Sequence, residues 1–389
     1  MKVPFREKKR YGERRSNTLA TVQGGFVVRK EYVLTRSESE KKKNEYTGCS
    51  LCPRNCHTER HKGFCAGYER TGDAPTADPI SENDVITLSR VALHYFEEPC
   101  ISGTRGSGTV FFTGCNLRCV FCQNRTIALG QHGKEVSLER FAEDLLRLQE
   151  QGANNINLVT PSHCVPQIVR VLSALRRDER LHIPVVYNTA SYEKVNSVRA
   201  LEGLVDVYLP DLKYYSSELS KAYAAAPDYF EVASRAIREM VRQVTEGGGP
   251  SVFSEKEGVS AAEKVQRSAS LRTPPKFCGI EEGILTRGII IRHLVLPGHT
   301  EDSKKIISYL HSEYGNAVTL SIMNQYTPCI SSEDRAAKKY PELMRRLTER
   351  EYDKVVDYAI QIGVENALIQ EGPTASESFI PPFEEFEGV

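Results

Sequence analysis

The stretch GTVFFTGCNLRCVFCQN, residues 108–124, decides how this chain is organised. Its apolar run Thr109–Thr113 predicts a β-strand, and three cysteines follow directly at C-x3-C-x2-C spacing. These cysteines are Cys115, Cys119 and Cys122. Three thiolates are one too few for a closed tetrahedral metal site, so a fourth position is left for another ligand.

Two kinds of metal centre accept three thiolates. A histidine could complete a Cys3His zinc site, but the nearest downstream histidine, His132, lies ten residues beyond Cys122 and finger-type spacing is absent. Alternatively, three cysteines can hold a [4Fe–4S] cluster and leave one iron free of protein ligands. Such an iron can bind a substrate, whereas a cluster with four cysteine ligands suits electron transfer. From the residues alone, both centres remain alternatives.

From about residue 85 to residue 372, apolar strand-like runs alternate with segments of helical periodicity. The predicted strands are Thr109–Thr113, Ile156–Thr160, Ile183–Tyr187, Val205–Leu209, Gly288–Leu296 and Ala317–Met323. The predicted helices are Leu138–Gln149, Val165–Arg176, Ser191–Leu201, Tyr229–Val244, Ser303–Tyr314 and Thr348–Gly363. Repeated βα units predict an α/β fold with a parallel sheet, and six of them predict a partial (β/α)6 barrel.

Polar residues gather just after the predicted strands, where parallel barrels carry their chemistry. The three cysteines follow the first strand, and Thr160 ends the second. Asn188 and Thr189 follow the third strand, where they either offer amide and hydroxyl groups to a ligand or cap a helix. Asp211 and Lys213 follow the fourth strand, and their spacing of two puts both side chains on one face. They form either an ordinary ion pair or part of a binding site.

Four segments differ in composition from the alternating core, residues 85–372. Residues 1–45 are polar and basic, and they predict a disordered arm. Residues 46–72 hold four cysteines among Gly, Pro, Arg and His, with too few apolar residues for a core, and predict a small metal-binding lobe. Residues 246–286 contain Gly-Gly-Gly-Pro and a Ser/Glu/Lys-rich stretch, which predict a flexible loop inserted into the core. Residues 373–389 are a C-terminal tail.

The four thiols of the predicted lobe fall within 17 residues, at Cys49, Cys52, Cys56 and Cys65. Four thiolates satisfy tetrahedral zinc and equally a [4Fe–4S] cluster with no open iron. Pro and Gly residues between them supply the tight turns that a metal-wrapped loop requires. Spacing alone does not choose between zinc and a second cluster.

Charge and hydropathy exclude several classes of protein. Lysine plus arginine total 51 and aspartate plus glutamate total 51, so no net field selects nucleic acid or an anionic membrane. No apolar run approaches the roughly 18–20 residues needed to span a bilayer. Eleven cysteines without a secretory signal predict a reducing compartment, the cytoplasm. Nine Lys/Arg within residues 1–30 leave an organellar presequence as the alternative.

The cysteine loop resembles the signature of the radical S-adenosylmethionine (SAM) superfamily, in which the residue before the last cysteine is usually aromatic, as Phe121 is here. Further stretches resemble a branch of uncharacterised iron–sulfur proteins similar to pyruvate formate-lyase activating enzyme. They are residues 94–124, Asn157–His163, Val205–Tyr214, Arg292–Gly298 and Ser321–Tyr326. The resemblance covers roughly residues 46–372.

The resemblance implies an enzyme with a [4Fe–4S] cluster on Cys115, Cys119 and Cys122, whose open iron chelates the methionine part of SAM. An electron from that cluster then cleaves SAM to methionine and a 5′-deoxyadenosyl radical, which abstracts hydrogen from a substrate. It also implies a low-potential electron donor of the flavodoxin or ferredoxin type. A second [4Fe–4S] cluster or zinc is the corresponding expectation for Cys49, Cys52, Cys56 and Cys65.

Roles for other residues follow from position. In the family, the segment after the second strand binds the methionine amino group, and Val159-Thr160-Pro161 stands there in this chain. The family's Asp-x-Lys matches Asp211 and Lys213, and a later arginine that holds the cofactor carboxylate matches Arg292. The cofactor-binding residues expected from the motif match and from the strand ends are Phe121, Thr160, Asn188, Thr189, Asp211, Lys213 and Arg292.

The substrate is left open between a glycyl-radical enzyme and a small metabolite or another protein side chain. The final strand, Ser321–Tyr326, has no clear counterpart of the histidine of glycyl-radical activating enzymes. Two other function classes compete with a SAM-cleaving enzyme. A zinc-dependent binding module would use the lobe and the basic arm, but it leaves the barrel unexplained. A non-catalytic electron carrier would need four protein ligands at each cluster.

Overall fold

The structure is a computed structural model, and it describes residues 49–57, 63–65, 85–244 and 279–370. The predicted arm (1–45), the predicted tail (373–389), most of the predicted insertion and parts of the lobe lie outside these residues. Within the described part, no helix is both long enough and apolar enough to cross a membrane.

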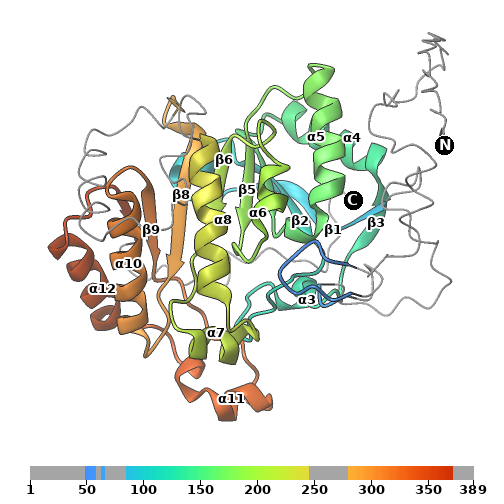
Figure 1. The fold of residues 1–389 in the computed structure, drawn as a ribbon. Helices are drawn as coiled ribbons and strands as arrows, with labels where there is room; N and C mark the ends of the chain where they lie inside the picture. The colour runs from blue at the N-terminus through green and yellow to red at the C-terminus, as the bar shows by residue number, and fades with distance from the viewer. Residues whose placement is uncertain (1–48, 58–62, 66–84, 245–278, 371–389) are drawn as a thin grey trace, which may run out of the picture. The chain divides into compact units, whose positions relative to one another are not determined.

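One mixed sheet organises the described residues, with the strand order β10-β9-β8-β6-β5-β4-β2-β1-β3 and β7 paired to β8 (Figure 1). Its strands from β2 to β10 along this order are parallel, which confirms the predicted partial barrel of parallel strands. The strands are β1 (Val85–His94), β2 (Ser107–Phe112), β3 (Lys134–Ser137), β4 (Ile156–Val159), β5 (Val185–Thr189), β6 (Val207–Pro210), β7 (Gly279–Glu281), β8 (Ile284–Leu294), β9 (Thr319–Met323) and β10 (Ala367–Ile369).

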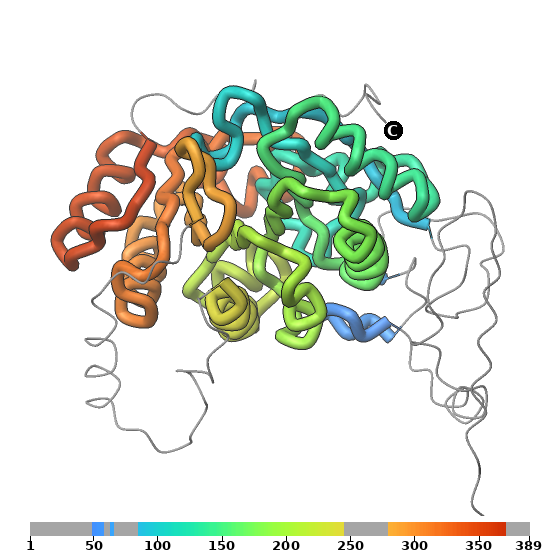
Figure 2. The backbone as a smooth tube through the Cα atoms, turned by 90° about the horizontal axis from the view of Figure 1, so that it is seen from above, coloured from blue at the N-terminus to red at the C-terminus, as the bar shows by residue number. Residues whose placement is uncertain are grey.

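Helices follow the parallel strands and cover the outer side of the sheet in chain order, as Figure 2 shows from above. The longer helices are α4 (Leu138–Glu150), α5 (Val165–Arg177), α7 (Ser217–Ala224), α8 (Tyr229–Val244), α10 (Thr300–Tyr314) and α12 (Glu349–Gln361). The short ones are α2 (Pro99–Ser102), α3 (Arg125–Ala128), η4 (Ser162–Cys164), α6 (Val195–Arg199), α11 (Arg335–Lys339) and η5 (Pro341–Met344).

All six predicted strands and all six predicted helices are present, with shifted ends. The largest shift concerns the helix predicted over Ser191–Leu201, which is confined to α6 because Ser191 takes a left-handed backbone conformation, with φ of 62°. The sequence analysis assigned no element to β1, β3 or β10. β1 and β3 extend the sheet with antiparallel pairing, and β10 adds a seventh parallel strand.

The end of the predicted insertion needs correction. Residues 279–286 are a β-hairpin, and β8 begins at Ile284 rather than at Gly288. The turn between its strands places Glu282 and Gly283 at φ of 50° and 81°. Two consecutive positive φ values are typical of a two-residue hairpin turn, whose twist matches that of the flanking strands.

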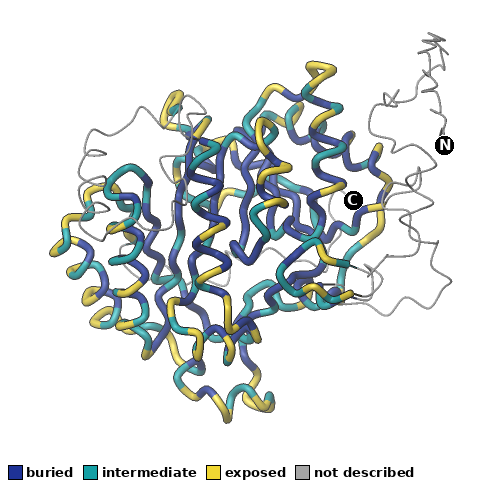
Figure 3. Tube along the Cα trace, in the orientation of Figure 1, coloured by how far each residue is buried: buried dark blue, intermediate teal, exposed yellow. Residues whose placement is uncertain are grey.

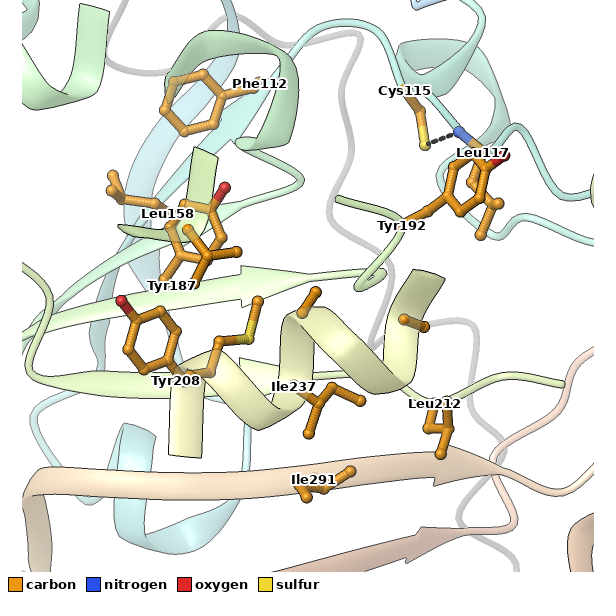
Figure 4. Packing of buried hydrophobic residues seen from close by; sticks show 14 of the residues in the cluster. Phe112, Cys115, Leu117, Leu158, Tyr187, Tyr192, Tyr208, Leu212, Ile237 and Ile291 are labelled. Atoms are coloured by element: carbon orange, nitrogen blue, oxygen red, sulfur yellow. Dashed lines mark hydrogen bonds between the residues drawn. The ribbon is translucent and has the colours of Figure 1, made fainter. Parts of the chain in front are cut away.

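The two faces of the sheet differ in chemistry. Outward residues of the strands, such as Leu158, Tyr208 and Ile291, pack with Ile237 of α8 in the main hydrophobic core (Figure 4). Figure 3 shows the same division, with buried strands at the centre and exposed residues along the outer sides of the helices. The inward face carries a second small core, which contains Val186, Val207 and Ile101 of α2.

Beyond that small core, the inward face is polar. Asn157, Asn188, Arg292 and Ser321 are all inward positions of β4, β5, β8 and β9, because they alternate with residues of the outer core. The outer face of the sheet is apolar, whereas this part of the inner face is polar. A polar lining of this kind can hold a ligand or buried charges.

A buried carboxyl on the outer side of β5 makes folding sensitive to pH. Burial raises the pKa of Glu193 to about 7, although hydrogen bonds from Thr189 and Tyr187 act against this rise. The side chain is 2% exposed. The folded protein therefore binds this proton more tightly than the unfolded chain does.

We expect Glu193 to lower the free energy of unfolding as the pH rises from about 4.5 to about 7, by roughly 2–3 kcal/mol. Below this window the carboxyl is protonated in both states, and above it the full cost of the buried charge is present. Glu193→Gln keeps the shape without the charge and should flatten this part of the curve. Denaturant unfolding at pH 5 and pH 8, in one metal-loading state, measures the difference. Glu150→Gln, exposed at the end of α4, is the control, and parallel wild-type and Glu193→Gln curves would contradict the prediction.

Candidate functional site

The three cysteines of the sequence motif lie on the loop between β2 and α3, at the carboxyl end of the first parallel strand. The loop is held by bonds to neighbouring elements. The Asn116 side chain donates to the carbonyl of Tyr192 at 2.7 Å, and the Val120 amide donates to the carbonyl of Tyr223 at 2.8 Å. Asn116 is 1% exposed, so this anchor is buried. The loop therefore has one defined path.

The thiols of this loop are close together and shielded from water. Cys115 and Cys119 are each 8% exposed, and the Leu117 amide donates to Cys115 Sγ at 3.3 Å (Figure 4). Burial raises the pKa of Cys119 to about 11, while Lys213 and Tyr214 act in the opposite direction. Burial, and then the proximity of Cys115 and Cys119, also raises the pKa of Cys122. Three thiolates close together in this loop therefore need a positively charged group, such as a metal centre, to balance their charge.

An iron–sulfur cluster fits this donor set. Among the described residues, no group of three or more His, Cys, Asp or Glu side chains converges as ligands of a single metal ion do. A cubane cluster distributes its thiolates over separate iron corners, so they need not converge on one point. Three neighbouring thiols on one short loop, two of them buried, match that requirement and leave the fourth corner without a cysteine.

A charged network on the inward face joins four of the predicted residues. Arg292 donates from Nε to Asp211 at 2.7 Å and from Nη2 to Asn188 Oδ1 at 2.6 Å. Its Nη1 lies 3.1 Å from a carboxylate oxygen of Glu97. Lys213 Nζ completes the network at 2.6 Å from Asp211. The predicted Asp211–Lys213 ion pair is therefore present and shares its carboxylate with Arg292.

This network reaches the cysteine loop through Lys213. Although burial alone raises the pKa of Asp211, Arg292 and Lys213 bring it below its usual value, so the carboxylate is charged. Lys213 is charged as well, because Asp211 and Cys119 raise its pKa against the effect of burial. A lysine between a carboxylate and a cluster thiol places positive charge where a cofactor carboxylate can meet it.

The other predicted residues have different surroundings. Thr160 takes φ of 60°, a left-handed conformation that is costly for a β-branched residue, and its amide bonds the Asn188 carbonyl at 2.9 Å. Thr189 points to the outer side of β5, where its hydroxyl bonds Glu193 rather than facing the inward network. Phe121 is buried and contacts the rings of Tyr214 and Tyr223 edge-on.

The sequence analysis missed two acidic residues and one tyrosine. Glu97 and Glu98 precede α2, which follows β1 and contacts β8. Glu97 accepts from the Asn157 and Asn188 side-chain amides at 3.1 and 3.2 Å. Tyr214 donates to Cys119 Sγ at 3.4 Å. A Glu-Glu-Pro sequence just before a helix was the available signal, but nothing local shows that it reaches Arg292.

The described thiols of the predicted lobe lie beside the cysteine loop. Cys52 and Cys65 are buried, at 6% and 8% exposure. Burial raises the pKa of Cys52, and the neighbouring Cys49 and Cys56 raise it further. The described cysteines of the chain are all free of disulfides. The lobe thus brings thiols together, in addition to the three of the loop.

Comparison with known proteins identifies one family domain within this chain. Residues 109–249 match the family model of the radical SAM superfamily. An uncharacterized protein of Methanocaldococcus jannaschii is 27% identical over 329 residues, which are 82% of this chain and 75% of that protein.

Two solved structures are similar to part of this chain. SuiB of Streptococcus suis bound to its precursor peptide SuiA is 13% identical with a TM-score of 0.38, over 66% of this chain and 46% of that chain. The structure of anSMEcpe with bound AdoMet is 12% identical with a TM-score of 0.38, over 64% of this chain and 58% of that one. This chain thus spans about half the length of these solved structures. By the family match, residues 109–249 of this chain are a radical SAM domain.

Proposed function

We propose that this protein cleaves SAM reductively and uses the resulting radical to abstract hydrogen from a substrate. The observation that carries the proposal is the loop of three neighbouring thiols at the end of β2, inside the matched domain, with Cys115 and Cys119 buried and Cys122 partly buried. When the loop holds a [4Fe–4S] cluster, reductive cleavage of SAM supplies methionine and the 5′-deoxyadenosyl radical.

The chain's own residues bind and orient the cofactor. Three donors of Arg292 are already engaged by Asp211, Asn188 and Glu97, so Arg292 has a supporting role in the barrel. The Lys213 ammonium donates one hydrogen bond within the described residues, to Asp211, and an ammonium group carries three donors. We therefore assign the contact with the methionine carboxylate to Lys213, and we assign to Arg292 and Asp211 the task of positioning Lys213.

Thr160 is the proposed backbone contact of the methionine amino group. Thr160 is a non-glycine residue held at φ of 60° directly after β4, and such strain is typical of binding sites. Phe121 packs against Tyr214 and Tyr223, and this packing holds the adjacent Cys122 in place.

A second metal at Cys49, Cys52, Cys56 and Cys65 is part of the proposal, either zinc or another [4Fe–4S] cluster. The lack of three ligands converging on one ion among the described residues favours the cluster over zinc. Its support is the cluster of neighbouring thiols in a segment that has few apolar residues of its own. Metal analysis of the Cys115/Cys119/Cys122→Ala variant, in which only the lobe can hold metal, identifies the ion. Remaining iron with matching sulfide indicates a cluster, remaining zinc indicates a zinc site, and no metal contradicts the site.

The proposed partners are a low-potential donor of the flavodoxin or ferredoxin type and a substrate that is a glycyl-radical protein, another protein side chain or a small metabolite. A reducing compartment such as the cytoplasm suits the free thiols of the described residues. The finer resemblance to pyruvate formate-lyase activating enzyme supports the glycyl-radical substrate, while Ser321–Tyr326 without a histidine counts against it.

Anaerobic reconstitution tests the central proposal. Purified full-length protein is loaded with iron and sulfide, reduced with dithionite and given SAM. We expect an iron–sulfur absorption band, a spin signal on reduction that changes when SAM is added, and equal amounts of methionine and 5′-deoxyadenosine. A protein that assembles the cluster yet leaves the spin signal unchanged by SAM and forms no 5′-deoxyadenosine would falsify the proposal.

A further inference from the structure

Arg54 connects the cysteine lobe to the loop of the radical-generating cluster. It lies between Cys52 and Cys56 in the lobe, and its Nε donates to the carbonyl of Asn116, one residue after Cys115, at 2.8 Å. Its Nη1 and Nη2 donate to the carbonyls of Ala225 and Ala224, at 2.5 and 2.7 Å. Those carbonyls end α7, where a cation is favoured by the helix dipole.

Two rings hold the guanidinium of Arg54 in place. Its central carbon lies 4.0 Å from the ring centre of Phe64 and 5.1 Å from that of Tyr192. Phe64 belongs to the lobe, and its amide donates to Cys56 Sγ at 3.3 Å. Tyr192 belongs to the barrel and accepts the side-chain bond of Asn116. The arginine is therefore packed between lobe and barrel with its donors aimed at fixed carbonyls.

The lobe also contacts the residue before Cys115. Gly114 has φ of 96°, and a Cβ at this position would lie 2.2 Å from the carbonyl oxygen of Cys65. The backbone of the lobe at Cys65 is therefore in close contact with the cluster loop. Together with the Arg54–Asn116 bond, this contact brackets Cys115 from both sides.

A separate set of bonds anchors the lobe without touching the cluster loop. Lys194 Nζ donates to the carbonyl of Ser50 and to Asn55 Oδ1, each at 2.6 Å. Ser197 Oγ donates to the carbonyl of Leu51 at 2.9 Å. Both residues follow β5. Lys194 is the N-cap of α6, and Ser197 lies within this helix. The lobe is thus fastened to the barrel at two places.

We propose that the lobe, ordered by the metal at its four cysteines, is a clamp that holds the cluster loop in its cluster-binding path, with Arg54 as the positioning residue. The inference rests on the proposed lobe metal. A segment with so few apolar residues depends on a metal for its order, and an ordered lobe is what presents Arg54 and the Cys65 carbonyl to the loop. Loss of the lobe metal therefore loosens the site of the radical-generating cluster.

Hydrogen exchange of residues 115–124 in the reconstituted full-length protein measures the clamp directly. Arg54→Ala, and Cys49→Ser/Cys52→Ser, are expected to speed this exchange on the order of tenfold or more, because docked backbone that becomes free to open exchanges faster. The same variants should lose iron and sulfide from the Cys115/Cys119/Cys122 site. Arg54→Lys keeps the charge without the fork and should fall between Arg54→Ala and wild type.

Lys194→Ala/Ser197→Ala distinguishes a clamp from a local effect of Arg54, because these residues touch the lobe and not the loop. Faster exchange at 115–124 in this variant supports the clamp. Exchange at the wild-type rate in it, or in Arg54→Ala, overturns the clamp. Arg177→Ala, an exposed arginine at the end of α5 paired with Asp178, is the matched control and should leave exchange and metal content unchanged.

The backbone amides of β5 and β6 are the control for global unfolding. Their hydrogen exchange should stay slow in every variant. Failure of the proposed function has a different signature from failure of the clamp. In that case the wild-type loop exchanges slowly and the variants exchange faster, as the clamp predicts, yet no protein forms 5′-deoxyadenosine from SAM.

Discussion

Replacing Cys119 by alanine is expected to lower 5′-deoxyadenosine formation by about a thousandfold or more, because the loop then keeps too few thiolates to retain a [4Fe–4S] cluster. Cys119 is the central cysteine of the three, and it is the one that meets both Tyr214 and Lys213. Its loss therefore also separates the loop from the charged network that we propose to position the cofactor.

The measurement compares iron, sulfide and 5′-deoxyadenosine per protein for wild type and Cys119→Ala after anaerobic reconstitution. Cys164→Ala is the matched control, since Cys164 is equally buried, at 6% exposure, but lies in the core beneath α5. It should keep the loop's iron and product formation at a modest cost in stability. Full product formation by Cys119→Ala would remove the basis for a three-cysteine cluster.

Arg292→Met is expected to be the most destabilising single substitution in the barrel, by about 3–5 kcal/mol. Arg292 is 12% exposed, and it neutralises Asp211 and Glu97, at 14% and 12% exposure. Removing it leaves two carboxylates inside the barrel with Lys213 alone as a cation. Removing one partner of a buried ion pair lowers the free energy of unfolding by far more than the intact pair contributes, because the remaining charge is buried without solvent or a partner.

Thermal unfolding of the same metal-loading state should show Arg292→Met melting roughly 10 °C below wild type. Arg345→Ala provides the control. Arg345 binds Glu351 with two bonds of 2.7 Å, but its side chain is 45% exposed, so the loss should be within about 1 kcal/mol. Equal effects of the two substitutions would show that burial does not set the strength of the Arg292 network.

Much of the architecture is readable from local sequence. The six predicted βα units are present because apolar period-2 and period-3.6 patterns reflect burial on the outer face of the sheet, and that burial is decided residue by residue. Short elements such as α2 and β10 were not predicted. They have three or four residues each, too few for a period to show, and they exist only because neighbouring strands and α2's packing against β8 complete them.

The candidate site divides in the same way. The spacing of the loop cysteines predicts them as metal ligands. The family resemblance predicts Asp211, Lys213 and Arg292 as site residues. Thr189 shows the limit of such reasoning, because it stands beside Asn188 in sequence but faces the opposite side of β5 and bonds Glu193. Side chains alternate along a strand, so a shift of one residue exchanges the barrel interior for the helix layer.

The sequence by itself determined the three-thiol loop, the parallel βα framework and the four-thiol segment, because each depends on residue types at short fixed spacings. Only the tertiary structure decided that Glu97 meets Arg292 across 195 residues, and that Arg54 of the lobe meets Asn116 of the cluster loop across 62. Those contacts depend on where the barrel brings distant segments together. A charge or a hydrogen-bond donor acts over a few ångströms of space, whatever the length of chain between the partners.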